Sequence, residues 1–218
     1  AIVLGVCGVG IPAAIQNLLN VTGMTILNNF TASYGADAVA AMGITQKINM
    51  VPMYIALGLS QGIMPLISYT YASRKYQRMK KTLTFSLKAA LTFIIAVAVL
   101  YFAGADFLIR LFMNNETIIG YGAKFLRGFC LALPFMCIDF VAVGVFQATG
   151  MGREALVFAI LRKILLEIPA LYILNALFPL YGLAYAQFVA EVVLAVAAVI
   201  ILVRLFKKLE RKETGRTE

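Results

Sequence analysis

Four ionisable side chains stand deep inside long apolar stretches of this 218-residue chain, where a charge is costly to place: Lys47, Asp139, Glu167 and Glu191. Charged residues at membrane depth usually face other protein groups or a water-filled pathway, and many bind a moving ion. Asp139 has no basic residue three or four positions away on its own helix. We therefore expect Asp139 to be the carboxylate that binds a proton or another cation.

The other two acids have polar neighbours at helical spacing. Lys163 precedes Glu167 by four positions, and Gln187 precedes Glu191 by four, so each pair shares one helical face. Such pairs can hold a bundle together or take part in coupling, and the spacing leaves both roles open.

Side-chain amides add further candidates for contacts with a substrate or cation. Asn20 lies in the first apolar stretch, while Gln46 and Asn49 flank Lys47, which we also expect to contact a substrate or cation. The plainer alternative is that these amides only cross-link helices. The sequence has no nucleophile–base pair, no phosphate-binding loop and no histidine, so we expect neither an enzyme nor a metal site nor an organic cofactor.

The elements that must position these groups are membrane helices. Hydrophobic residues make up 62% of the chain, against about 45–50% in soluble domains, and the mean hydropathy is +0.90. These values predict an all-α, multi-pass bundle in a lipid bilayer, because a helix crosses with about 20 apolar residues. Six helices are predicted, over residues 2–32, 37–72, 82–104, 117–149, 154–177 and 181–206. Residues 106–113 form an amphipathic stretch that we expect at the membrane interface.

Basic residues predict the orientation. They gather in the linker 73–81, in the region 150–163 and in the tail after residue 203, which together hold 14 of the 19 Lys and Arg residues. With six spans these regions share one side, which the positive-inside rule assigns to the cytoplasm. The expected organisation is a lobe over residues 1–206 and a basic cytoplasmic tail over 207–218, in the cytoplasmic (inner) membrane. The positive charge therefore does not indicate nucleic-acid binding.

The second predicted helix carries a specific motif. Its residues Gly58, Gln61, Gly62, Pro65, Tyr69 and Tyr71 follow the pattern Gly-x-x-Gln-Gly-x-x-Pro-x-x-x-Tyr-x-Tyr. This pattern resembles that of the MATE family of multidrug and toxic-compound extrusion transporters. Residues 146–153 are similar to the family's turn after helix ten, and residues 178–184 resemble its entry to helix twelve.

The resemblance implies the C-terminal six-helix lobe of a twelve-helix transporter, whose N-terminal lobe is the missing partner. It also implies antiport, in which Na⁺ or H⁺ enters while amphipathic organic compounds leave. The start at Ala1, without an initiator Met, agrees with a piece of a longer protein. Ion-binding members carry a glutamate eight residues after a proline, but here Asn20 stands eight after Pro12. Asp139 matches the family's helix-ten aspartate only with a shift of about one helical turn. The coupling ion is therefore expected in either lobe.

Two other functions compete with drug export. A flippase for lipid-linked oligosaccharides or polysaccharides shares the architecture but needs a strongly cationic cavity, for which only Lys47, Arg162 and Lys163 are available. A structural or channel-like six-helix protein is the alternative from another class. The polar residues are scattered over at least five predicted spans, which disfavours a symmetric channel.

Overall fold

Long apolar runs with few interruptions produce an almost wholly helical chain. The computed structural model describes residues 2–214, although not every side chain near the two ends, and it has no strand in that range. The long helices are α1 (Ile2–Ala32), α2 (Ala36–Ala72), α3 (Tyr76–Ala103), α5 (Glu116–Ala148) and α8 (Gly182–Thr214). The shorter elements are α4 (Ala105–Arg110), α6 (Gly152–Ile160), the π-helix η1 (Leu161–Glu167) and α7 (Ile168–Leu177).

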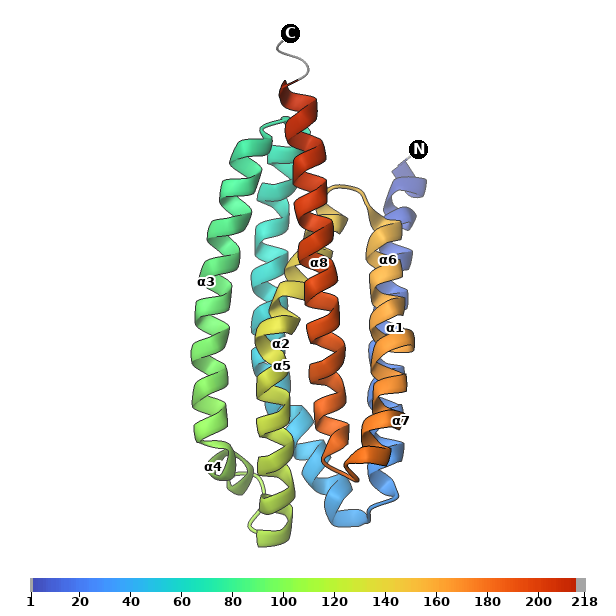
Figure 1. Cartoon of the computed structure of the whole chain (residues 1–218), viewed down its shortest axis with the longest axis vertical. Helices are drawn as coiled ribbons and strands as arrows, with labels where there is room; N and C mark the ends of the chain where they lie inside the picture. The colour runs from blue at the N-terminus through green and yellow to red at the C-terminus, as the bar shows by residue number, and fades with distance from the viewer. Residues whose placement is uncertain (1, 215–218) are drawn as a thin grey trace.

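The structure confirms the predicted all-α membrane bundle. Its long segments follow the six predicted spans in order, with α6, η1 and α7 forming one continuous helical path. In the described part of the chain, α2, α3, α5 and α8 are each long and apolar enough to cross a membrane. The linkers α2–α3 and α5–α6 lie toward the same end of the bundle as both termini (Figure 1). This arrangement agrees with the predicted common side for the basic linkers.

Helix α5 is the centre of the bundle. It contacts α2, α3, α4, α6 and α8. Of its most apolar 18-residue stretch, 78% is buried, against 22–33% for the same stretch in α2, α3 and α8. Close packing onto α8 requires Gly128, since a Cβ there would lie 2.8 Å from the Cβ of Ala184. Contact with α2 includes a hydrogen bond of 2.7 Å from the Ser60 hydroxyl to the Phe140 carbonyl. Helix α5 is therefore the most deeply buried of the four candidate spans.

The predicted amphipathic stretch contains α4 and the turn after it. Arg127 on α5 donates to Asp106 on α4 at 2.6 Å, and Arg110 at the end of α4 pairs with Glu116 at 3.0 Å. The side chain of Asn115 accepts a hydrogen bond from the Thr117 backbone N–H and so caps the start of α5. These polar contacts fix the turn into α5.

Two predictions about the C-terminal half differ from the structure. Helix α8 continues to Thr214, beyond the predicted end of the sixth helix at residue 206, and residues 215–218 lie outside the described range. The predicted regular helix over 154–177 contains the π-helix η1. Pro169 has no N–H to donate to the helix, and the Ile168 N–H bonds to the Lys163 carbonyl, five residues back. π-helical turns are rare and often mark functional sites.

Candidate transport cavity and buried charge cluster

A cavity of about 430 Å³ lies among α1, α2, α5, η1 and α8. Its polar lining is contributed by Gln16, Asn17, Asn20, Gln46, Asn49, Ser60, Gln61, Gln147, Arg162, Lys163, Glu167 and Gln187. The cavity thus collects polar side chains from five elements into one space.

Three of the predicted amides line this cavity. Asn20 and Gln46 are partly buried, and the Gln46 amide donates to the Asn28 side chain at 3.3 Å. Asn49 is buried, and its side-chain oxygen has no hydrogen-bond partner among the described residues. Lys47, predicted as a fourth contact, is exposed and absent from the lining, because neighbouring helical positions point in different directions.

Methionine and aromatic side chains supply the apolar lining. The methionines are Met24, Met50, Met53 and Met64, and the aromatic residues are Tyr54, Phe129 and Phe140. Met has a flexible, polarizable side chain that adapts to ligands of different shape. The sequence analysis missed these residues. Met50, Met53 and Leu57 are spaced three and four residues apart, and this spacing could have predicted that they share the helical face that lines the cavity.

The π-helix places three charged side chains in the interior. Hydrogen bonding between residues five apart brings Arg162 and Glu167 toward the same side of η1. The Lys163 ammonium donates to both Glu167 carboxylate oxygens, at 2.8 and 2.6 Å, and both residues are buried. Gly23 on α1 makes room for this pair, since a Cβ there would lie 3.0 Å from the Lys163 nitrogen.

A second buried cluster connects three helical elements. Arg162 on η1 donates to the Glu191 carboxylate on α8, and its guanidinium lies 5.2 Å from the Phe140 ring centre. Asp139 lies on α5, which packs against α8, and neither of its carboxylate oxygens has a hydrogen-bond partner among the described residues. Asp139 is 1% exposed, Glu191 0% and Arg162 8%. These three residues are called the carboxyl–arginine cluster below.

This geometry corrects two sequence-based interpretations. Arg162 was counted with the basic residues of region 150–163 that were assigned to the cytoplasmic side, but it is buried because it turns inward on η1. Gln187 points its amide at the Met136 sulfur, at 3.9 Å, and Glu191 is paired with Arg162 instead. The spacing of residues on one helix gave no signal for this contact between helices.

The three members of the carboxyl–arginine cluster differ in whether their side chains line the cavity. Arg162 lines the cavity, whereas Asp139 and Glu191 do not. Both Asp139 oxygens and one Glu191 oxygen are buried without a hydrogen-bond partner among the described residues. Arg162 is therefore the member that lines the cavity, and it is paired with Glu191 behind it.

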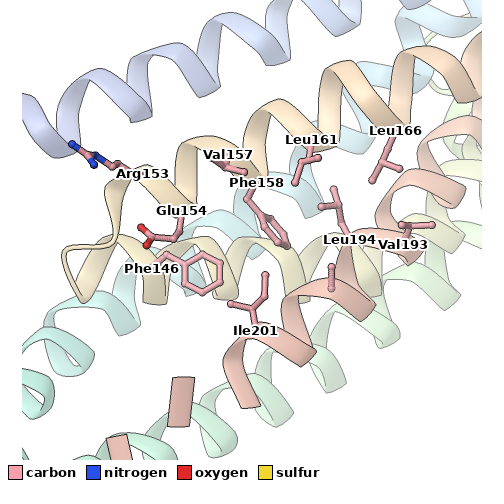
Figure 2. Close-up of a pocket in the computed structure, with 11 residues that line it drawn as sticks. Phe146, Arg153, Glu154, Val157, Phe158, Leu161, Leu166, Val193, Leu194 and Ile201 are labelled. Carbon is pink, nitrogen blue, oxygen red and sulfur yellow. The ribbon is translucent and has the colours of Figure 1, made fainter. Parts of the chain in front are cut away.

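A second hollow, of about 490 Å³, lies on another face of the same helical path (Figure 2). It is a mainly apolar groove formed by α5, α6, η1 and α8, with Phe146, Phe158 and Leu194 among its lining residues. Glu154 and Arg153 lie together at one end of this groove (Figure 2). None of the five buried charges lines it, so the polar cavity is the better candidate for transport chemistry.

A helical membrane bundle with a polar internal cavity and buried charges is an architecture expected of a membrane transporter. The MatE family model matches residues 12–173 of the chain. The chain therefore belongs to the MatE family, whose members are transporters and not enzymes, and the resemblance drawn from the sequence is confirmed.

Curated relatives agree with this membership. The chain is 35% identical over 202 residues to the multidrug export protein MepA of Staphylococcus saprophyticus, and 36% over 203 residues to MepA of Staphylococcus haemolyticus. Each alignment covers 92% of this chain and 44% of the relative. The chain thus spans less than half the length of these relatives.

Solved structures show the same fold. A MATE protein crystallised in complex with MaL6 superposes with a TM-score of 0.90 at 20% identity, covering 96% of this chain and 48% of that one. The bent form of the Vibrio cholerae MATE transporter VcmN gives a TM-score of 0.85 at 20% identity, covering 95% and 46%. The match to about half of each structure is consistent with one lobe of a two-lobed transporter.

Proposed function

We propose that this chain is the C-terminal lobe of a cation-coupled antiporter that exports amphipathic organic cations across the cytoplasmic membrane. The observation that carries the proposal is the cavity, where methionine and aromatic side chains stand beside amides. Flexible Met-rich surfaces can repack around different ligands, which suits a transporter of many compounds. The names of the MepA relatives support the same function.

Charge in the cavity supports a cationic substrate. Lys163 is paired with Glu167, and Arg162 with Glu191, so the described lining offers no free positive charge. A flippase for an anionic lipid-linked precursor needs such charges, and their pairing disfavours it. An organic cation requires no anchoring positive charge and gains from nearby carboxylates.

The proposed pathway lies between this lobe and the N-terminal lobe, with the C-terminus in the cytoplasm. The basic linkers at the end of the bundle that holds the C-terminus support this orientation.

The test uses the full-length transporter in proteoliposomes loaded with ethidium. We expect efflux when an inward gradient of H⁺ or Na⁺ is imposed and little efflux without a gradient. Equal efflux with and without both gradients contradicts coupled antiport. Transport of a lipid-linked oligosaccharide in place of ethidium would favour the flippase.

A further inference from the structure

We propose that the apolar groove formed by α5, α6, η1 and α8 binds an acyl chain of one zwitterionic phospholipid, with the lipid phosphate at Arg153 and its cationic amine at Glu154. The groove shares no lining residue with the polar cavity, so this lipid is a bound ligand and not transported cargo. The inference goes beyond the proposed function and does not depend on it. The leaflet concerned is the one beside the α5–α6 linker, which the proposed orientation makes the cytoplasmic one.

The lining of the groove fits a hydrocarbon chain. Nine of its eleven lining residues are apolar, and the other two are Arg153 and Glu154. The volume of about 490 Å³ lies within the range of about 300–1,000 Å³ that is usual for small-molecule sites. Val157 on α6 and Val193 on α8 line the groove and are both about half exposed, so the groove opens on the surface of the lobe. An acyl chain that fills it gains dispersion contacts with both walls.

The length of the groove fits one leaflet of a bilayer. On α8 the lining extends from Val193 to Ile201, which are eight positions or about 12 Å apart along the helix axis. On the opposite wall it extends from Arg153 to Leu166, which are thirteen positions or at most about 20 Å apart. Half of the hydrocarbon core of a bilayer is about 15 Å thick. A chain that enters beside Arg153 can therefore lie in the groove for most of the depth of its leaflet.

A tight turn between α5 and α6 places charge at one end of the groove. Gly150 has a φ of 76°, which favours glycine, and the Met151 N–H donates to the Phe146 carbonyl at 2.8 Å. Helix α6 therefore begins directly beside the end of α5. Arg153 and Glu154 follow in the first turn of α6, and Figure 2 shows both at one end of the groove. The headgroup of a lipid whose chain fills the groove would lie at this end.

Arg153 and Glu154 are free to bind a headgroup. Both residues are exposed, and neither side chain forms an ion pair or hydrogen bond with another described residue. A zwitterionic headgroup carries a phosphate and a cationic amine, which match the guanidinium and the carboxylate in sign. A purely anionic headgroup would meet the Glu154 carboxylate as a like charge. The two side chains together therefore favour a zwitterionic lipid.

The groove and the polar cavity lie on different sides of η1. Leu161 and Leu166 line the groove, whereas Arg162 and Glu167 line the cavity. The members of each pair are five positions apart, which is the hydrogen-bonding interval of a π-helix. An acyl chain packed on the two leucines therefore supports the helix that turns Arg162 and Glu167 inward. We expect the lipid to stabilise η1 and, through it, the charged lining of the cavity.

The headgroup is tested with the full-length transporter, freed of lipid in detergent and titrated in native mass spectrometry. The probes are phosphatidylethanolamine and phosphatidylglycerol with identical acyl chains, and wild type should bind phosphatidylethanolamine more tightly. Glu154→Gln should weaken phosphatidylethanolamine binding by about fivefold, the upper range for an exposed ion pair, and should strengthen phosphatidylglycerol binding. Arg153→Gln should weaken binding of both lipids by a similar factor. Asp37→Asn and Arg78→Gln, exposed residues outside the groove, are the matched controls.

The chain site is tested with Ala197→Phe, which fills the groove from α8. It should lower the affinity for both lipids by about tenfold or more, because it excludes several methylene groups. Val196→Phe, at an exposed neighbour outside the groove, is the control and should bind as wild type does. Glu154→Gln, at an exposed position, tests the site independently should Ala197→Phe fail to fold.

Hydrogen–deuterium exchange measures the effect on η1. Phosphatidylethanolamine should slow exchange in Leu161–Glu167 and leave exchange in Tyr76–Ala103 of α3, which is outside the groove, unchanged. Unchanged exchange in η1 would show that the lipid does not support the π-helix.

The binding outcomes are equally decisive. Tighter binding of phosphatidylglycerol by wild type, or equal affinities that Glu154→Gln does not alter, overturn recognition of a zwitterionic headgroup. Unchanged binding in Ala197→Phe overturns the groove as the acyl-chain site. None of these measurements requires transport, so failure of the wild-type protein to export ethidium would contradict only the proposed antiport.

Discussion

The pairing of each buried charge decides what that residue can do. Lys163 and Glu167 satisfy each other on η1, whereas Asp139 has no hydrogen-bond donor in the described structure. A closed ion pair contributes to the bundle but is a poor site for a moving ion. An acid without a donor can still accept a proton.

Glu167→Gln should therefore lower the amount of folded transporter, because it leaves the Lys163 ammonium buried without its carboxylate. Breaking a buried pair costs about 3–5 kcal/mol. Thermal unfolding in detergent measures the loss, with Asp37→Asn, an exposed acid on α2, as the control. Replacing both partners, Lys163→Met with Glu167→Leu, should recover much of it. An unchanged unfolding temperature in Glu167→Gln would show that the pair does not stabilise the lobe.

A substitution at Asn20 tests whether the amide side chains that line the cavity contribute to substrate binding. Asn20→Leu should weaken ethidium binding by about 1 kcal/mol, the usual worth of a neutral hydrogen bond. Asn29→Leu is the matched control, because Asn29 lies on the same helix, is exposed and does not line the cavity. Fluorescence titration of the full-length protein gives both affinities. Equal affinities would remove Asn20 from the binding surface.

At the scale of elements, the packing of α5 against α8 sets the distance between two buried acids, since Asp139 lies on α5 and Glu191 on α8. Gly128 allows that close contact. A larger residue there must push α8 away or displace Ala184.

Gly128→Val should destabilise the bundle by about 1–3 kcal/mol, the usual cost of overpacking, and should reduce gradient-driven efflux. Gly120→Val on the same helix is the control, since a Cβ at Gly120 meets nothing within 4 Å. Thermal unfolding and efflux are measured for both variants. Equal behaviour of the two would mean that α5 and α8 tolerate a wider separation.

At the scale of the whole molecule, the chain spans less than half the length of its MepA relatives, and the proposed pathway lies between it and an N-terminal lobe. Reconstituted alone, it should show no gradient-driven ethidium efflux. Co-expression with the N-terminal half of the full-length transporter should restore efflux. Robust transport by the chain alone would mean that it is complete or pairs with itself.

Membrane topology can be tested in the full-length protein after Cys7, which is exposed, and any cysteine outside this chain have been replaced by serine. A cysteine introduced as Tyr76→Cys should react with an impermeant thiol reagent from the cytoplasmic side, and one introduced as Asn114→Cys from the outside. The reverse labelling would contradict the proposed orientation.

The sequence by itself determined the membrane class, the order of the six helical segments and the family. Apolar run length and the positions of Lys and Arg are local properties, and they follow directly from the cost of burying charge in lipid. The motif from Gly58 to Tyr71 indicated the family from the sequence alone, and the match to the MatE family model confirmed that family.

Only the tertiary structure decided how the charges are partnered. Arg162 and Glu191 are 29 positions apart, and helical periodicity relates residues within one helix only. The π-helix turned Arg162 inward, although the sequence had placed it with the basic surface residues. The separation of Asp139 and Glu191 depends on how closely α5 packs against α8, which is set by side-chain volumes on both helices together.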